Sequence, residues 1–172
     1  RGVMRAPRSS VVVSVGRRPN TDDIGLDGTG VQLSDRGFVE VDERCRTGEQ
    51  GVWAVGDCIN TPALAHVGFV EGILAVKDIL DEDPVPVDYT NVPWAIYCHP
   101  EVAFAGLTEQ AAKDAGFDVV TSKHRWTGNG RALIIGDTVG VVKIVAEKRE
   151  DGTAGRILGV HLCGPWATEQ LG

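Results

Sequence analysis

The chain contains 172 residues, of which 42% are hydrophobic and 24% are charged, and its formal net charge is −7. This composition is ordinary for a folded protein, and the acidic balance argues against nucleic acid as a main partner. No apolar run approaches the roughly 18 residues that span a bilayer, and residues 1–10 lack the apolar core of a secretory leader. We therefore expect a cytoplasmic protein with no membrane partner.

The first predicted element is a β-branched run, Val11–Val15, which is typical of a buried strand. Gly16 follows this run directly. It is either a plain turn residue or a point where a nucleotide approaches the backbone, because ligands bind at strand ends in open α/β sheets. Arg17 and Arg18 come next, and they either contact phosphates or form a solvated surface patch.

The next two predicted elements are β-rich. Residues 31–42 predict a hairpin with its turn at 35–37, and residues 51–57 predict a strand that ends in Gly56 and Asp57. A glycine has no Cβ, so a ligand can come close to it, and the adjacent carboxylate can accept hydrogen bonds from sugar-type hydroxyls. This pair is either part of a site for a polyol-linked cofactor such as FAD or simply a strand end followed by a turn.

The strongest helix prediction runs from residue 64 to residue 80. Its apolar residues recur at spacings of three or four, as expected for one buried stripe: Leu64, Val67, Val70, Ile73, Leu74 and Leu80. The first turn of a helix has unbonded N–H groups, which suit an anionic or polarised ring. We therefore expect Ala63, Leu64, Ala65 and His66 to offer backbone N–H groups to a ligand.

Two polar residues of this predicted helix, His66 and Glu71, have more than one possible role. A helix N-terminus disfavours an imidazolium by about 0.3–1 kcal/mol, so His66 should tend toward the neutral form, and a capping or packing role is favoured over catalysis. Glu71 lies in the middle of the helix near the apolar stripe. It either pairs with a group across an interface or is solvated.

Residues 81–93 contain three prolines and little periodicity, so we predict a linker and a domain boundary there. Beyond the linker the patterns predict a β-α-β-β module of the α+β class. Its strands are expected at 94–98, 102–106, 117–126, 140–148 and 156–164, with one helix over 108–115 and another beginning near Trp166. Residues 127–130 are expected to form a loop and not a phosphate cradle, because no strand-to-helix context surrounds them.

The four cysteines are at positions 45, 58, 98 and 163, with no CxxC or CxxxxC pair among them. That spacing matches neither a zinc site nor a disulfide framework. The prediction is four reduced thiols and no bound metal.

Five segments in order carry a resemblance: SVGRRPNT (14–21), the predicted hairpin, TGEQGVWAVGDC (47–58), PALAHVGFVEG (62–72) and IYCHPEVAFAGLTE (96–109). Together they resemble the flavoprotein disulfide reductases, and within that family the dihydrolipoamide dehydrogenases. The resemblance covers residues 11–172 almost continuously. It implies an incomplete α/β FAD/NAD(P)-binding portion over residues 1–91, followed by an incomplete α+β dimerisation domain over residues 92–172.

The resemblance also implies roles for single residues. Asp57 would bind the ribityl hydroxyls of FAD, residues 63–66 would present amides to the flavin pyrimidine edge, and Gly16 would lie against NAD. The implied reaction oxidises protein-bound dihydrolipoyl groups through an enzyme disulfide and FAD, with NAD+ as acceptor. The implied partners are a second subunit of a homodimer and the lipoyl-bearing acyltransferase of a 2-oxoacid dehydrogenase complex.

The sequence lacks several parts of the family's machinery, namely the amino-terminal FAD fingerprint, the CxxxxC redox pair, the NAD glycine motif and the His-Glu catalytic pair. We therefore expect a fragment of a longer protein that is inactive by itself, with no catalytic residue among these 172. Two alternatives stay open. One is another flavoprotein disulfide reductase, such as a glutathione or mercuric reductase or a soluble transhydrogenase, and the other is a non-enzymatic dimerisation module.

Overall fold

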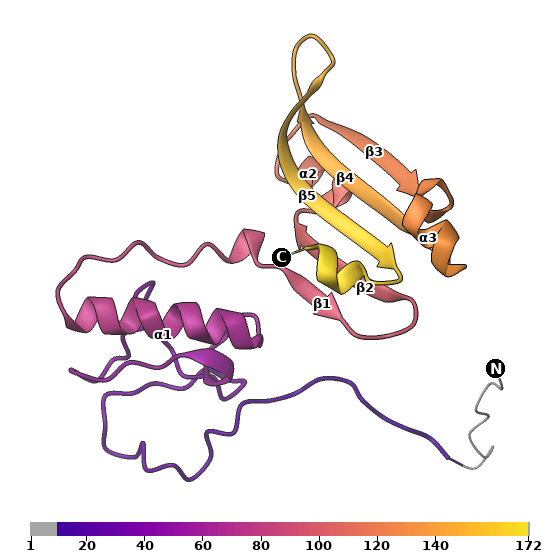
Figure 1. The fold of residues 1–172 in the computed structure, drawn as a ribbon. Helices are drawn as coiled ribbons and strands as arrows, with labels where there is room; N and C mark the ends of the chain where they lie inside the picture. Colours follow the sequence, from indigo (N-terminus) through magenta and orange to yellow (C-terminus); the bar gives the residue numbers. More distant parts are fainter. Residues whose placement is uncertain (1–9, 172) are drawn as a thin grey trace. The chain divides into compact units, whose positions relative to one another are not determined.

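The structure is a computed structural model that describes residues 10–171 (Figure 1). The chain divides into two compact units, one up to Val87 and the other from Asp88 onward. Each unit has its own buried clusters of apolar side chains.

The first unit is built around one long helix, α1 (Ala65–Ile79), and a short 3-10 helix, η1 (Gly56–Cys58). Three isolated β-bridges connect the loops that pack beneath the helix: Leu33 with Val39, Val39 with Ile59, and Arg46 with Trp53. The buried core of this unit consists of Val39, Cys45, Ile59 and Leu74. Loop segments far apart in the sequence are thus held against one face of α1.

The prediction of a buried strand over Val11–Val15 is wrong. These residues have no regular secondary structure, and their valine side chains are exposed, Val12 to 90%. A strand is stable only when its backbone groups pair with another strand. Among residues 10–171, no segment forms a backbone hydrogen bond with this run.

The other β-rich runs of the first unit form tight turns with little pairing. The hairpin turn is present: the Ser34 amide donates to Phe38 O at 2.8 Å and the Gly37 amide donates to Ser34 O at 2.8 Å. Around it, only one bridge forms between Leu33 and Val39. The predicted strand 51–57 is likewise reduced to one bridge at Trp53, and its last two residues belong to η1.

The helix predicted over 64–80 is confirmed within one residue at each end, but the phase of its buried stripe is wrong. The buried positions of α1 are Val67, Glu71, Leu74, Ala75 and Asp78. Three residues assigned to the stripe, Val70, Ile73 and Leu80, are exposed. The helix faces the core with two acidic residues because both acids have hydrogen-bond partners inside the unit.

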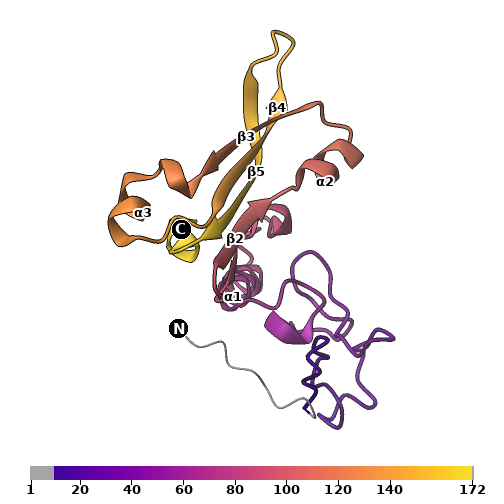
Figure 2. The ribbon, with the colours of Figure 1, turned by 90° about the vertical axis from the view of Figure 1, so that its right-hand side faces the viewer.

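The second unit is an α+β module, as predicted. Its strands are β1 (Trp94–Ile96), β2 (Glu101–Gly106), β3 (Val119–Arg125), β4 (Val141–Lys148) and β5 (Ala154–Gly164). They form one antiparallel sheet in the order β1-β2-β5-β4-β3. The loop of the β4–β5 hairpin projects from one end of the sheet in both ribbon views (Figures 1 and 2).

Short helices complete the second unit. They are η2 (Tyr89–Asn91), α2 (Glu109–Asp114), η3 (Trp126–Gly128), α3 (Gly130–Ile135) and η4 (Ala167–Gln170). One buried cluster joins η3, α3 and η4 to the sheet through Trp126, Ala132 and Ala167, which pack with Ala103 and Leu162. A second cluster packs Ala112 of α2 against Val145 and Leu158. The helix expected near Trp166 is the 3-10 helix η4.

The expectation that residues 127–130 lack a strand-to-helix context is wrong. The segment follows β3 and opens α3. Asn129 is the N-cap of that helix, because its Oδ1 accepts a hydrogen bond from the Ala132 amide at 3.0 Å. Gly136, with φ of 72°, ends the helix in the left-handed conformation. The asparagine and the glycine together were the signal for this short helix.

Glu109 connects α2 to the sheet. Its carboxylate accepts hydrogen bonds from Lys113 Nζ, on the same helix, and from Lys143 Nζ, on β4, each at 2.7 Å. The hydrogen bond from Lys113, followed by that from Lys143, lowers the pKa of Glu109 to about 2. The folded state therefore holds this group ionised at pH values at which an unfolded chain protonates it.

We expect this contact to make the second unit sensitive to acid. A lowered folded-state pKa stabilises the protein above the unfolded pKa, which is 4.5 for this group, and the stabilisation is lost as the pH falls toward about 2. Glu109→Gln removes the ionisation, so its melting temperature should depend less on pH over this window than that of the wild type. Thermal melts followed by circular dichroism test this. Identical pH dependence in the two proteins would contradict it.

Candidate functional site

The Gly56–Asp57 turn is the centre of the candidate site. Gly56 has φ of 76°, a conformation that favours glycine, and its carbonyl oxygen accepts a hydrogen bond from the Ile59 amide at 3.0 Å. A Cβ built on Gly56 would meet no atom within 4 Å. Asp57 is exposed. The turn therefore presents open backbone next to an accessible carboxylate.

The start of α1 is the second part of the candidate site. Leu64 is the N-cap residue, in an extended conformation, and no side chain caps the helix there. The amides of Val67 and Gly68 donate to Leu64 O at 3.0 and 3.1 Å, and the first turn contains no acidic residue. The helix N-terminus thus keeps its partial positive charge, which favours an electron-rich group nearby.

Two contacts bring the turn and the helix together. Glu71 Oε2 accepts a hydrogen bond from the Gly56 amide at 2.6 Å. A Cβ built on Gly68 would lie 3.6 Å from Gly56 Cα, so the backbones of helix and turn approach closely. Figure 1 shows η1 beneath the end of α1 at which the helix starts. The structure therefore places Asp57 beside the N-terminal half of the helix that begins at Ala65.

Glu71 differs from both interpretations offered by the sequence. Its side chain is fully buried, so it is not solvated, and one of its partners is the Gly56 amide of its own unit. An acidic residue is seldom buried completely unless its carboxylate is hydrogen-bonded. No sequence pattern indicates the Gly56 partner, but the helical phase of Glu71 with Val67 and Leu74 indicates its burial.

Gly16 is exposed, with φ of 123°, and it follows a segment without regular structure and not a strand. The residue after it does reach the candidate site: Arg17 Nη1 lies 3.6 Å from Asp57 Oδ2. Both side chains are more than 60% exposed, so this pair is weak. Arg18 points to a different acid, Asp22, at 3.5 Å. Of the two arginines, Arg17 is thus the neighbour of Asp57.

The four cysteines are free thiols. Cys45 is buried in the core of the first unit, and burial, followed by the negative charges of Glu71 and Asp42, raises its pKa to about 11. A thiol with such a pKa stays protonated at neutral pH and is a poor nucleophile. Cys58 is half-buried and donates to Val55 O at 3.3 Å. No pair of these residues forms a redox-active disulfide.

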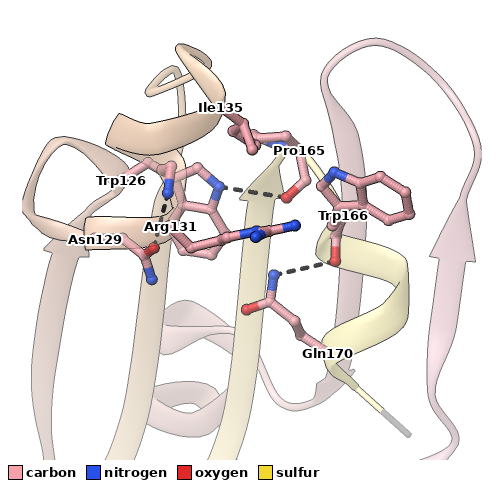
Figure 3. A pocket seen from close by; sticks show the side chains of 8 residues that line it. Trp126, Asn129, Arg131, Ile135, Pro165, Trp166 and Gln170 are labelled. Carbon is pink, nitrogen blue, oxygen red and sulfur yellow. Dashed lines mark hydrogen bonds between the residues drawn. The ribbon is translucent and has the colours of Figure 1, made fainter.

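A separate cavity lies in the second unit, with a volume of about 380 Å³ (Figure 3). Its walls include Trp126, Trp166 and Arg131, and Figure 3 shows the Arg131 side chain reaching across toward Trp166. Trp126 Nε1 donates to Pro165 O at 3.4 Å, and Gln170 Nε2 donates to Trp166 O at 3.1 Å. These bonds hold the segment after β5 beside Trp126. None of the predicted site residues lines this cavity.

Residues 10–171 contain neither a metal-binding cluster nor a membrane-spanning helix. No group of three or more His, Cys, Asp or Glu side chains in this part of the chain is arranged to hold a metal ion. No helix in the same range combines the length and the apolar character needed to cross a membrane.

Comparison with known families gives two matches. The model described as pyridine nucleotide-disulphide oxidoreductase matches residues 5–72, and the model of the dimerisation domain of the same family matches residues 92–172. Together they cover the chain except for its first four residues and residues 73–91. Both models therefore point to one class of proteins, the pyridine nucleotide-disulphide oxidoreductases.

Individual relatives agree with this class. A dihydrolipoyl dehydrogenase of Geobacillus stearothermophilus is 44% identical over 161 residues, which are 94% of this chain and 33% of that protein. A mitochondrial dihydrolipoyl dehydrogenase of Caenorhabditis elegans is 42% identical over 162 residues, 94% of this chain and 32% of that protein. The chain thus belongs to the pyridine nucleotide-disulphide oxidoreductase family, and it spans about a third of the length of these relatives.

Solved structures give the same result. LpdA of Mycobacterium tuberculosis superimposes with a TM-score of 0.78 at 29% identity, over 88% of this chain and 32% of that one. The HOCl-induced flavoprotein disulfide reductase RclA of Escherichia coli superimposes with a TM-score of 0.81 at 25% identity, over 92% of this chain and 36% of that one. The fold of this chain is therefore that of one part of a flavoprotein disulfide reductase.

Proposed function

We propose that this chain is about one third of an FAD-dependent dihydrolipoyl dehydrogenase. The full-length enzyme oxidises protein-bound dihydrolipoyl groups through an enzyme disulfide and FAD, with NAD+ as the final acceptor. The observation that carries the proposal is the Gly56–Asp57 turn held against the start of α1, in a chain that is 44% identical to a dihydrolipoyl dehydrogenase over 161 residues.

The residues present fit FAD. The Asp57 carboxylate is accessible and can accept hydrogen bonds from the ribityl hydroxyls, while the open space beside Gly56 admits the cofactor chain. The N-terminus of α1, which no side chain caps, can stabilise the flavin pyrimidine edge through amides in the segment from Ala63 to His66, apart from the Leu64 amide, which donates to Pro62 O at 2.8 Å. When bound, FAD supplies the two-electron carrier between dithiol and nicotinamide.

The proposal gives each of the two regions of the chain a role in the enzyme. Residues 1–91 are the C-terminal part of the FAD/NAD(P)-binding region, with Gly16 against NAD. Residues 92–172 are a truncated dimerisation domain that pairs with a second subunit. We further propose that the lipoyl-bearing acyltransferase of a 2-oxoacid dehydrogenase complex is the partner that supplies the substrate, and that the enzyme works in the cytoplasm.

The 172 residues are not sufficient for turnover. The four cysteines lie at positions 45, 58, 98 and 163, so the sequence contains no CxxxxC pair to accept electrons from a dithiol. Residues of this chain bind and orient the cofactor, and the chemical step requires groups from the remainder of the enzyme. Purified residues 1–172 should therefore show no lipoamide-dependent NAD+ reduction.

The test uses the full-length protein that contains these residues. It should be isolated with the visible absorbance of bound flavin and should reduce NAD+ with dihydrolipoamide as substrate. A parallel assay with oxidised glutathione and a reduced nicotinamide separates this activity from that of a glutathione reductase. A protein that stays colourless after incubation with FAD would refute the proposal. Turnover of oxidised glutathione without turnover of dihydrolipoamide would identify the protein as a glutathione reductase instead.

A further inference from the structure

We propose that Glu71 is a positioning residue for the cofactor site: its buried carboxylate fixes Gly56, and through Gly56 it sets the position of the Asp57 side chain. This inference rests on the proposed binding of FAD at Asp57. It assigns a function to a residue in the second turn of α1 that the sequence patterns do not connect to the cofactor.

The first observation is the burial of the Glu71 side chain, which is fully removed from solvent. Transferring a carboxylate into the protein interior is unfavourable unless hydrogen-bond donors replace its water. One such donor is the Gly56 amide, at 2.6 Å from Oε2. The Gly56 amide gives the buried carboxylate a hydrogen-bond donor, and the carboxylate gives the amide an acceptor. The burial of Glu71 and the position of the turn are therefore coupled.

The second observation concerns the other restraints on Gly56. The backbone of α1 approaches it at Gly68, where an added Cβ would lie 3.6 Å from Gly56 Cα. A Cβ placed on Gly56 itself would have no atom within 4 Å, so side-chain packing does not press on that side of the turn. The carbonyl of Gly56 is held by the Ile59 amide at 3.0 Å, which is a bond within the turn itself. The bond to Glu71 connects the Gly56 backbone to α1, the helix whose start is proposed to face the cofactor.

This arrangement makes Glu71 important for affinity without direct contact with the cofactor. Asp57 follows Gly56 in the chain, so a rotation of the Gly56 backbone redirects the carboxylate. When a turn samples several conformations, the observed dissociation constant equals the intrinsic constant divided by the fraction in the competent conformation. Removing the Glu71 acceptor lowers that fraction, because the half-buried Gly56 amide then gains free energy by turning toward water.

The experiment measures FAD binding to the full-length apoprotein by titration of flavin fluorescence. Glu71→Ala should raise the dissociation constant by about tenfold, the effect of losing one well-placed hydrogen bond to a charged group. Glu71→Gln keeps an oxygen acceptor at the same place, so its dissociation constant should lie between those of the wild type and Glu71→Ala. If Glu71→Ala does not fold, Glu71→Met, which keeps the length of the side chain without the acceptor, replaces it.

The matched control is Leu74→Ala. Leu74 is on the same buried face of α1 and packs with Ile59 and Val39, but it forms no hydrogen bond with the turn. Its loss should lower the melting temperature of the apoprotein and leave the FAD dissociation constant within about twofold of wild type, since the turn keeps its anchor. If Leu74→Ala weakens FAD binding as much as Glu71→Ala at equal loss of melting temperature, the role of Glu71 is structural only.

The two levels of the proposal fail in different ways. A wild-type apoprotein that does not bind FAD overturns the proposed function and this inference with it. A wild-type protein that binds FAD, together with a Glu71→Ala or Glu71→Met variant of unchanged affinity, overturns the inference and leaves the function intact. A Glu71→Gln variant as weak as Glu71→Ala would also overturn it, because the acceptor oxygen alone would then not account for the effect.

Discussion

Asp57→Ala should weaken FAD binding to the full-length protein by about 10–100-fold, the range expected when hydrogen bonds to a charged acceptor are lost. The carboxylate is exposed and next to the backbone of Gly56, where packing leaves space for a ligand. Titration of the apoprotein with FAD, followed by flavin fluorescence, gives the dissociation constant. The loss should appear in cofactor affinity and not in folding, because the side chain has no buried contact.

Two control variants make this result interpretable. Asp22→Ala removes another exposed acid of the same unit, which pairs with Arg18, and should leave the affinity unchanged. Arg17→Ala removes the cation 3.6 Å from Asp57 without removing the carboxylate. If Asp22→Ala weakens FAD binding as much as Asp57→Ala, the effect is one of surface charge, and Asp57 is not a ligand-binding residue.

Asp78→Ala should produce the largest loss of stability in the first unit. The Asp78 side chain is 1% exposed and receives two hydrogen bonds from Arg46, from Nε to Oδ2 and from Nη2 to Oδ1, each at 2.6 Å. Trp53 Nε1 adds a third, to Oδ2 at 3.0 Å, and Arg44 Nη1 lies 3.4 Å from Oδ1. Removing the carboxylate leaves these donors of the 44–53 loop without their acceptor, which is strongly destabilising.

The measurement is thermal unfolding of the wild-type and Asp78→Ala proteins, and a decrease of several degrees is expected in the melting temperature. Glu82→Ala, an exposed acid just after the same helix, serves as the control and should have no effect. The hydrogen bond from Arg46, and then that from Trp53, lowers the pKa of Asp78 to about 2. The difference in melting temperature between wild type and Asp78→Ala should therefore become smaller as the pH falls from about 4 to 2. A difference in melting temperature that does not change with pH would contradict the ion-pair explanation.

The helix α1 and the turn before it could be predicted because their signals are local. Apolar residues at spacings of three and four indicate a helix whatever surrounds it, and a Gly-Asp pair after a β-rich run indicates a turn. Apolar residues alone give the wrong phase for the buried face, because acidic residues are part of that face. Residues 67, 71, 74 and 78 recur at spacings of four, three and four, and two of these four positions are acids.

The prediction of a strand over Val11–Val15 is wrong for a different reason. Strand formation depends on pairing with backbone that is distant in sequence, so a β-branched run indicates only a preference. The short helix α3 was missed because a six-residue helix has no measurable periodicity, and its signals are the Asn129 cap and Gly136. Strands β2, β4 and β5 were predicted correctly because their ends are marked by turns that the sequence shows clearly.

In the candidate site, the sequence indicated Asp57 and the residues that open α1, but two further neighbours came only from the structure. Glu71 reaches Gly56 across 15 positions in the sequence, and Arg17 reaches Asp57 across 40. Both contacts depend on how separate segments pack, which no local pattern encodes. The sequence therefore indicated the turn and the start of the helix better than the contacts that join them.

The position of β5 has a consequence for biosynthesis. This strand is the last of the sheet to be translated, yet it lies in the middle, between β2 and β4. While residues 154–164 are still inside the ribosome, the β1–β2 and β3–β4 pairs each expose an unsatisfied edge that can associate with other nascent chains. A polypeptide released before residue 154 would keep both edges open, so completion of β5 is the step that protects the newly made domain from aggregation.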